Sequence, residues 1–245
     1  MNRIPALSAV VFDLDGTLID QQAAADAAST AWAAEHGITD GDVATRWKRI
    51  ATKHYRRWQA REISFQDQRR ERVREFLNRP MTDAEASLVF DGYLDRYETG
   101  WRLFDDAIPA LRRARDAGLA VAVLTNGDRA QQLRKIERFA LDGEIDLLLC
   151  SSDLPAGKPD PRAFAAVLER LGAVAAEAIM IGDSREADYD GARSFGMHAV
   201  HLDREAPPRD LVADSIRTLD ELRFSSRRGR HTGHAQPSHA GLITD

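Results

Sequence analysis

Short apolar runs that end in polar turns recur along the chain, and this recurrence constrains the fold more than any other feature. The four clearest runs lie at residues 9–12, 119–124, 145–149 and 178–181, and a weaker one lies at 199–202. Helical patterns stand between the later runs, at residues 108–117, 129–141 and 161–171. Short apolar runs are typical of buried strands, and strands that alternate with helices form parallel sheets covered on both faces. The pattern predicts an α/β fold with a three-layer, Rossmann-like core.

Residues 20–100 break this alternation. The segment has no convincing strand, and its aromatic residues recur at helical spacing, as in Trp47, Tyr55 and Trp58. Four such helical patterns predict an antiparallel, all-α bundle inserted after the first strand. From residue 225 the composition shifts to Ser, Arg, His, Gly and Pro without periodicity, which predicts a disordered tail. We therefore expect a core of residues 1–19 and 101–224, a helical insertion at 20–100 and a tail at 225–245.

The composition excludes several classes of protein. Of the 245 residues, 43% are hydrophobic and 30% are charged, as in ordinary globular proteins, and the net charge of −5 argues against a dedicated nucleic-acid binder. The single cysteine, Cys150, excludes an intrachain disulfide and a CxxC zinc site. No apolar stretch approaches the ~18 residues that span a membrane, and the first run is too short for a signal peptide. These features predict a cytoplasmic protein without a membrane partner.

Carboxylates stand at the ends of the first and fourth runs. Asp13 and Asp15 come after the first run, and Asp183, with Asp188 five residues on, comes after the fourth. Because parallel strands present their carboxyl ends at one edge of a sheet, we expect these acids to meet there. Oxygen ligands of this kind suit Mg²⁺, and a pair of acids suits phosphoryl transfer, with one as nucleophile and the other as general acid. The alternatives are a solvated turn or a calcium loop, but a calcium loop would need a glutamate where Ala24 stands.

Two further turns carry groups that suit an anion. Thr125, Asn126 and Gly127 end the second run with a hydroxyl group and backbone N–H groups at the start of a predicted helix. Lys158 lies between a glycine and a proline, where it can neutralise a phosphate oxygen as a point charge. Taken alone, each signal is weak, because turns of this composition and solvated lysines are common.

Together these elements resemble the haloacid dehalogenase superfamily. The motifs that carry the resemblance are FDLDGT at 12–17, TNG at 125–127, GKPDP at 157–161 and GDSREAD at 182–188. The resemblance covers residues 7–19 and 101–222. It implies that the insertion at 20–100 is a helical cap, which closes over the site and carries most of the substrate choice.

The resemblance also implies a role for each motif residue. Asp13 would be the nucleophile and a Mg²⁺ ligand, and Asp15 would be the general acid and base, with its backbone carbonyl also on the metal. Lys158 would hold the oxygens of the nucleophile and the phosphate together. Asp183 would bind the metal directly, and Asp188 would support the metal site indirectly. The residues implied to bind phosphate are Thr125, Asn126, Gly127 and Lys158.

The residue two positions after the nucleophile distinguishes the branches of this family. Relatives that cleave carbon–halogen bonds carry Tyr there and phosphonate-cleaving relatives carry Ala, whereas this chain has Asp15, which can protonate a leaving alkoxide. Sugar phosphomutases share the Asp, but their gating histidine aligns with Ala25. Another departure is Ala187, where many relatives have Asn. The resemblance thus implies a Mg²⁺-dependent phosphomonoester hydrolase that forms an aspartyl-phosphate on Asp13, with a phosphomutase or another hydrolase of the family as the alternative.

One stretch of the insertion is strongly basic. Residues 46–79 contain twelve Lys or Arg and four acids, a net charge of +8. This charge favours steering of anionic substrates, but a solvated helix face is an equal alternative. A third alternative is a non-catalytic module that binds nucleic acid or another anion, although such a module would not need the catalytic acids and Lys158. Residues 68–74 resemble a branch with sialic-acid-9-phosphate and pyrimidine-nucleotide phosphatases. We expect a small phosphorylated metabolite such as a nucleotide or sugar phosphate as substrate, no nucleic-acid partner, and a monomer or homodimer.

Overall fold

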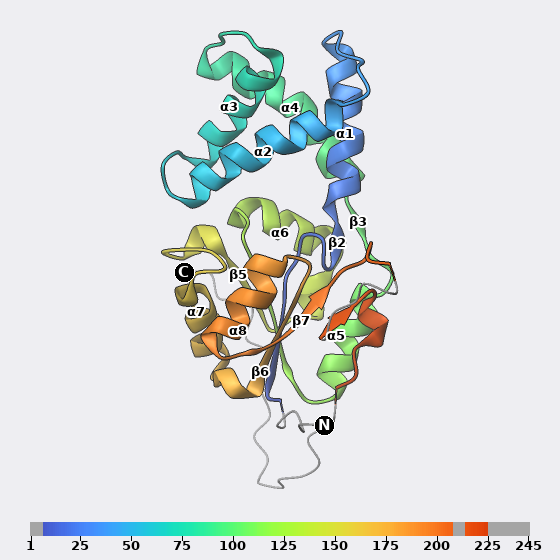
Figure 1. The fold of residues 1–245 in the computed structure, drawn as a ribbon, viewed down its shortest axis with the longest axis vertical. Coiled ribbons are helices and arrows are strands. Elements are labelled where there is room, and N and C mark those ends of the chain that lie inside the picture. The colour runs from blue at the N-terminus through green and yellow to red at the C-terminus, as the bar shows by residue number, and fades with distance from the viewer. Residues whose placement is uncertain (1–6, 208–213, 225–245) are drawn as a thin grey trace, which may run out of the picture.

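A six-stranded parallel sheet forms the centre of the protein (Figure 1). The computed structural model describes residues 7–207 and 214–224, so the predicted tail at 225–245 lies outside the described residues. In spatial order the strands are β5 (Leu147–Cys150), β4 (Ala120–Thr125), β1 (Ala9–Phe12), β6 (Ala178–Gly182), β7 (His198–Leu202) and β8 (Ser215–Ile216). β1 pairs with β4 on one side and with β6 on the other, so Phe12 lies beside Val123 and Ile181. The residues that follow these three strands therefore meet at one edge of the sheet, and the predicted parallel α/β fold is confirmed.

The structure differs from the predicted strands chiefly in where one strand begins and in three very short strands that were not predicted. β5 begins two residues later than predicted, because Asp146 pairs with Val121 through its own side chain, whose Oδ2 accepts the Val121 N–H at 2.8 Å. β8 is missing from the prediction because two residues are too few to form a recognisable run. The same holds for β2 (Ile19–Asp20) and β3 (Arg102–Leu103), which form a separate antiparallel ribbon.

Two pairs of helices cover the two faces of the sheet. The helices on one face are α5 (Ala107–Asp116) and α6 (Arg129–Arg138), and those on the other are α7 (Pro161–Leu171) and α8 (Gly191–Phe195). Side chains alternate along β1, since Val10 and Phe12 pack with the first pair and Ala9 and Val11 with the second. Every residue of β1 is therefore fully buried, which explains why its sequence is apolar throughout.

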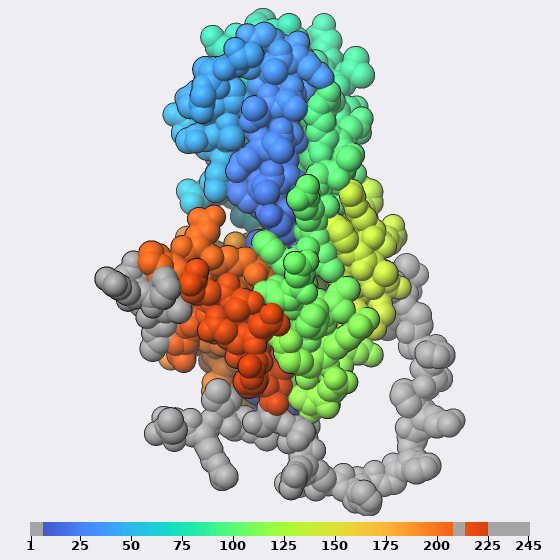
Figure 2. Space-filling view, turned by 90° about the vertical axis from the view of Figure 1, so that its right-hand side faces the viewer, coloured from blue at the N-terminus to red at the C-terminus, as the bar shows by residue number. Residues whose placement is uncertain are grey.

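Four further helices form a layer above the carboxyl edge of the sheet (Figures 1 and 2). They are α1 (Gln21–Glu35), α2 (Val43–Gln59), α3 (Phe65–Leu77) and α4 (Asp83–Gly100), and we call them the helical segment. Ser64 and Thr82 start α3 and α4 with capping boxes. In each box, the side chain of the first residue accepts the backbone N–H of the residue three positions later, whose own side chain accepts the backbone N–H of the first. The chain enters and leaves the segment through the ribbon of β2 and β3. The segment has an aromatic core of Trp32, Trp47, Phe76, Phe90 and Tyr93.

None of the helices within residues 7–207 and 214–224 is both long enough and apolar enough to cross a bilayer.

Candidate active site

The loop that follows β1 places two carboxylates at the carboxyl edge of the sheet. The backbone N–H of Asp13 donates to the carbonyl of Ile181 at 2.9 Å, and the Asp13 side chain is buried. Gly16 then turns the chain with a φ of +88°, and a Cβ at this position would collide with the carboxylate of Asp183. Glycine suits both the left-handed backbone and this close approach. The turn thus lets the loop of Asp13 and Asp15 lie against the loop that follows β6.

Three carboxylates gather where β1 and β6 end. Oxygens of Asp13, Asp183 and Asp188 all lie within 4.8 Å of one another. Burial raises the pKa of Asp13 well above its usual range, in spite of the nearby ammonium group of Lys158. Loss of water around the Asp183 carboxyl, together with the charge of Asp188, raises the pKa of Asp183 to about 6. The site thus disfavours the charged forms of these crowded acids. A divalent cation would balance their negative charges, so the cluster suits such an ion.

Lys158 balances part of this negative charge. Its Nζ atom lies 2.6 Å from Oδ1 of Asp13 and 2.6 Å from Oδ1 of Asp188, and the side chain is buried. Burial alone would lower the pKa of Lys158, but the two carboxylates outweigh burial and raise it. Lys158 therefore stays charged, and it acts as a fixed cation rather than as a base.

Two side chains of α6 hold the carboxylate of Asp15, and the sequence motifs include neither of them. Its Oδ2 accepts a hydrogen bond from Nε2 of Gln132 at 2.8 Å, and its Oδ1 lies 2.5 Å from Nζ of Lys135. Gln132 and Lys135 are both only 1% exposed, and they lie three residues apart on one face of α6. Long polar residues are rarely buried without a partner, so their place on the inner face of a predicted helix is the signal that would have identified them.

The turn after β4 combines structural contacts with groups that suit an anion. Oγ1 of the buried Thr125 accepts a hydrogen bond from Nε2 of Gln132 at 2.7 Å. The side-chain amide of Asn126 forms two hydrogen bonds of 2.7 Å with the backbone of Lys158, and these tie the turn to the loop after β5. The backbone N–H groups of Asn126 and Gly127 donate to no acceptor in the described part of the chain. The turn, which lines the cavity, therefore has two backbone donors without an acceptor among the described residues, while the Asn126 side chain holds Lys158 in place.

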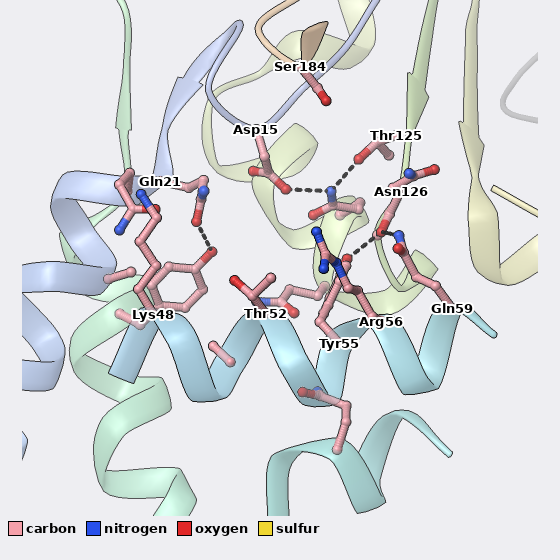
Figure 3. Close-up of a pocket in the computed structure, with 18 of the residues that line it drawn as sticks. Asp15, Gln21, Lys48, Thr52, Tyr55, Arg56, Gln59, Thr125, Asn126 and Ser184 are labelled. Atoms are coloured by element: carbon pink, nitrogen blue, oxygen red, sulfur yellow. Dashed lines mark hydrogen bonds between the residues drawn. The ribbon is translucent and has the colours of Figure 1, made fainter. Parts of the chain in front are cut away.

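One cavity, between the core and the helical segment, joins these groups (Figure 3). It has a volume of about 740 Å³, and all eight residues that the motifs predicted line it. The opposite wall comes from all four helices of the helical segment. Figure 3 shows the side chains of α2 that face the core, namely Lys48, Thr52, Tyr55, Arg56 and Gln59.

Direct contacts hold the helical segment over the cavity. The hydroxyl of Tyr55 donates to the backbone carbonyl of Asn126, in the turn after β4. Just beyond α2, the guanidinium of Arg61 donates to the carbonyls of Ser151 and Leu154 at 2.6 and 2.7 Å. These contacts fix the position of the α2 wall relative to the carboxylates.

The arrangement brings three chemical functions into one cavity. Asp13 presents a carboxylate oxygen beside a fixed ammonium group, as a nucleophile for a phosphorus or carbon centre requires. Asp15 lies two residues away and can carry a proton. The turn after β4 offers backbone donors to the oxygens of an anion.

Comparison with known proteins supports a hydrolase with these chemical functions. The model of a hydrolase family, the haloacid dehalogenase-like hydrolases, matches residues 7–196. A phosphoserine phosphatase of Thermus thermophilus is 39% identical over 121 residues, which are 49% of this chain and 49% of that protein. A ribulose-1,5-bisphosphate 5-phosphatase of Halopiger xanaduensis is 35% identical over 119 residues, which are 49% of this chain and 50% of that protein. The chain thus spans about half the length of the curated relatives it matches.

Solved structures with a similar fold include both general hydrolases and dehalogenases. A HAD-hydrolase from Bacillus subtilis, bound to magnesium, superposes with a TM-score of 0.71 at 23% identity and covers 88% of this chain and 96% of its own. A 2-haloacid dehalogenase from Pseudomonas syringae has a TM-score of 0.61 at 26% identity, with coverage of 88% and 96%. The fold is therefore shared across different chemistries, and the reaction has to be inferred from the residues of the site.

Proposed function

The chain belongs to the haloacid dehalogenase-like hydrolase family, and from this premise we propose that it is a Mg²⁺-dependent phosphatase of small phosphomonoesters. The observation that carries the proposal is the placement of Asp15. Its carboxylate is held by Gln132 and Lys135 in the same cavity that Asp13 lines. An alkoxide that leaves phosphorus needs a proton, whereas a departing halide does not, so a second acid at this place favours ester hydrolysis. The relatives named as phosphatases support the same choice.

The proposed reaction has two half-reactions. In the first, an oxygen of Asp13 attacks phosphorus, the bond from phosphorus to the leaving oxygen breaks, and Asp15 gives that oxygen its proton. The ammonium of Lys135, 2.5 Å from Asp15, stabilises the carboxylate that remains. In the second, Asp15 takes a proton from water, the water oxygen attacks phosphorus, and the bond from phosphorus to Asp13 breaks to release phosphate. Lys158 neutralises charge on the phosphoryl oxygens, and the backbone N–H groups after β4 donate hydrogen bonds to them.

The residues of the site fit a divalent cation. The three clustered carboxylates outnumber the single ammonium of Lys158, which contacts two of them, and oxygen ligands of this type suit Mg²⁺. Asp13 and Asp183 would hold the ion through their carboxylates, and Asp15 would hold it through its backbone carbonyl. Asp188, which also accepts the backbone N–H of Ser184 at 3.0 Å, would position its neighbours. When bound, the ion supplies positive charge that lets a phosphate dianion approach the acids.

We expect removal of divalent metal to stop the reaction. Excess EDTA should lower phosphate release to the background rate, and added Mg²⁺ should restore it, because the clustered carboxylates would otherwise repel the substrate. Mg²⁺ should also raise the melting temperature of the wild-type protein but not that of Asp183→Ala, since a ligand stabilises only the fold that binds it. Full activity in excess EDTA would contradict a metal-dependent mechanism.

A comparison of released products separates a phosphatase from a dehalogenase. The protein with Mg²⁺ is incubated with p-nitrophenyl phosphate, sugar phosphates and nucleotides, and in parallel with 2-chloropropionate. We expect inorganic phosphate from several esters and no chloride. Chloride release, or a failure to release phosphate from every ester, would overturn the proposed function.

We propose, further, that residues 20–100 act as a cap over a core formed by residues 1–19 and 101–224. Every predicted catalytic residue lies outside 20–100, whereas α1, α2, α3 and α4 supply the opposite wall of the cavity. A division of this kind leaves the chemistry to the core and assigns the choice of substrate to the side chains of the helical wall.

A further inference from the structure

The arginines of α3 divide into two groups. Arg70 and Arg74 lie on the side that faces away from the cavity, and both are paired. Nη1 of Arg70 lies 3.2 Å from Asp67 and 3.0 Å from Asp83. Arg74 lies 2.8 Å from Glu71 and 2.6 Å from Asp83. These two arginines therefore belong to a solvated, charge-balanced helix face, whose ion pairs contribute little to stability.

The second group faces the cavity and has no acidic partner. Arg69 and Arg72 lie three residues apart, so they share one face of α3, and both line the cavity. Among the described residues, no carboxylate oxygen lies within 4 Å of either guanidinium. Arg72 contacts Oε1 of Gln68 at 3.2 Å, and its buried Nε has no hydrogen-bond partner in the described part of the chain. Arg69 makes one long contact of 3.4 Å with Gln131.

Aromatic rings form the surroundings of this pair. The guanidinium of Arg72 lies 4.9 Å from the ring centre of Trp47, 5.3 Å from that of Phe90 and 5.7 Å from that of Tyr93. Arg69 also lies 5.3 Å from the centre of Phe90, so the two cations share one ring. Loss of water lowers the pKa of both arginines, and the charge of Arg72 lowers that of Arg69 further. Two adjacent, partly buried cations with no carboxylate of the described residues within 4 Å are costly unless an anion joins them.

We propose that Arg69 and Arg72 bind a second anionic group of the substrate, so that the enzyme prefers phosphomonoesters that also carry a carboxylate or a second phosphate. The inference rests on the proposed function, because the pair lines the same cavity as Asp13 and Asp15. The aromatic rings strengthen each charge–charge contact by excluding water from it. Arginine also suits the task, since its planar fork can donate two parallel hydrogen bonds to a carboxylate or a phosphate.

Matched substrate pairs test this proposal. The carboxylate arm compares 3-phosphoglycerate with glycerol 3-phosphate, and the phosphate arm compares fructose 1,6-bisphosphate with fructose 6-phosphate. For the wild-type enzyme, kcat/KM should be about 10–100-fold higher for the doubly anionic member of at least one pair, as expected for hydrogen bonds between charged groups. The arm that shows the preference identifies the second anion as a carboxylate or a phosphate.

Variants on the same helix show whether Arg72 is responsible. Arg72→Met should remove the preference, because it should lower kcat/KM for the doubly anionic substrate far more than for p-nitrophenyl phosphate, and Arg72→Lys should keep part of the preference. Arg70→Met is the matched control, because it removes a paired arginine that does not line the cavity, and it should keep the full preference. The melting temperature of Arg72→Met should not fall, since it loses a cation without a carboxylate partner.

Three outcomes would overturn the proposal. One is a wild-type enzyme that does not distinguish the members of either pair. Another is an Arg72→Met variant that loses activity equally on all substrates, which would place Arg72 on the transferred phosphoryl group or in the fold. The third is an equal loss of preference in Arg70→Met. Calorimetry with the same four probes on Asp13→Asn measures the preference as binding alone. If the wild type hydrolyses no ester, the proposed function fails, and the binding data still decide whether Arg69 and Arg72 select a second anion.

Discussion

Asp13→Asn is expected to abolish phosphate release, with a loss on the order of 10⁴-fold or more, because the neutral amide cannot form the bond to phosphorus. The loss should be equal for alkyl phosphates and for p-nitrophenyl phosphate, since no leaving group compensates for a missing nucleophile. Asparagine keeps the shape of the side chain, and Lys158 keeps its contact with Asp188 at 2.6 Å. The variant should therefore fold, which circular dichroism and the melting temperature check.

Asp105→Asn provides the control for Asp13→Asn. Asp105 is an exposed acid of the core that does not line the cavity, so its substitution should change kcat/KM by less than about twofold. A folded Asp13→Asn protein that keeps more than a few per cent of wild-type activity would show that another group attacks phosphorus.

Asp15→Asn is expected to lower the rate by an amount that depends on the leaving group. General acid–base groups are worth about 10²–10⁴-fold, so the loss should reach this range for alkyl phosphates, whose alkoxide needs a proton. It should be smaller in the first half-reaction of p-nitrophenyl phosphate, because the phenolate leaves without one. The measurement is single-turnover kinetics on the two substrates. Equal losses on both would show that Asp15 holds the site together rather than transfers a proton.

Lys135→Met is the matched variant for Asp15. It removes the ammonium that lies 2.5 Å from Asp15 and leaves the hydrogen bond from Gln132 at 2.8 Å. A positioning role for Lys135 predicts a loss with the same leaving-group dependence as in Asp15→Asn, and smaller in size.

The sequence predicts that the acids Asp13 and Asp183 lie close together, because their positions follow from the strands. Asp13 directly follows β1 and Asp183 directly follows β6, and these two strands pair in the structure, so the two acids meet. The partners of Asp15 are harder to predict, because the contact with Lys135 depends on the rotation of α6 about its axis. The motifs do not fix that rotation, and only the buried polar face of α6 reveals it.

The basic stretch at residues 46–79 is likewise hard to interpret from the sequence, because the rotation of its helices is not known. Its charge is evident from the sequence, but the phase of α3 decides which arginines are balanced and which face the cavity. Arg70 and Arg72 are two residues apart, and they point to opposite sides. On α2, Arg46 pairs with Asp40 at 3.1 Å and does not line the cavity, whereas Arg56 does. The alternative of a solvated helix face therefore describes the paired arginines Arg46, Arg70 and Arg74, whereas steering of anionic substrates stays a prediction for the arginines that line the cavity.

The measurement that tests the covalent mechanism most directly is mass spectrometry of Asp15→Asn quenched in acid during turnover of p-nitrophenyl phosphate. Without Asp15 to take a proton from water, the second half-reaction slows, and the phosphoryl group should accumulate on the peptide that contains Asp13. The same peptide from Asp13→Asn should carry no phosphoryl group. An Asp15→Asn protein that turns over p-nitrophenyl phosphate with no adduct on Asp13 at any time point would contradict the aspartyl-phosphate mechanism.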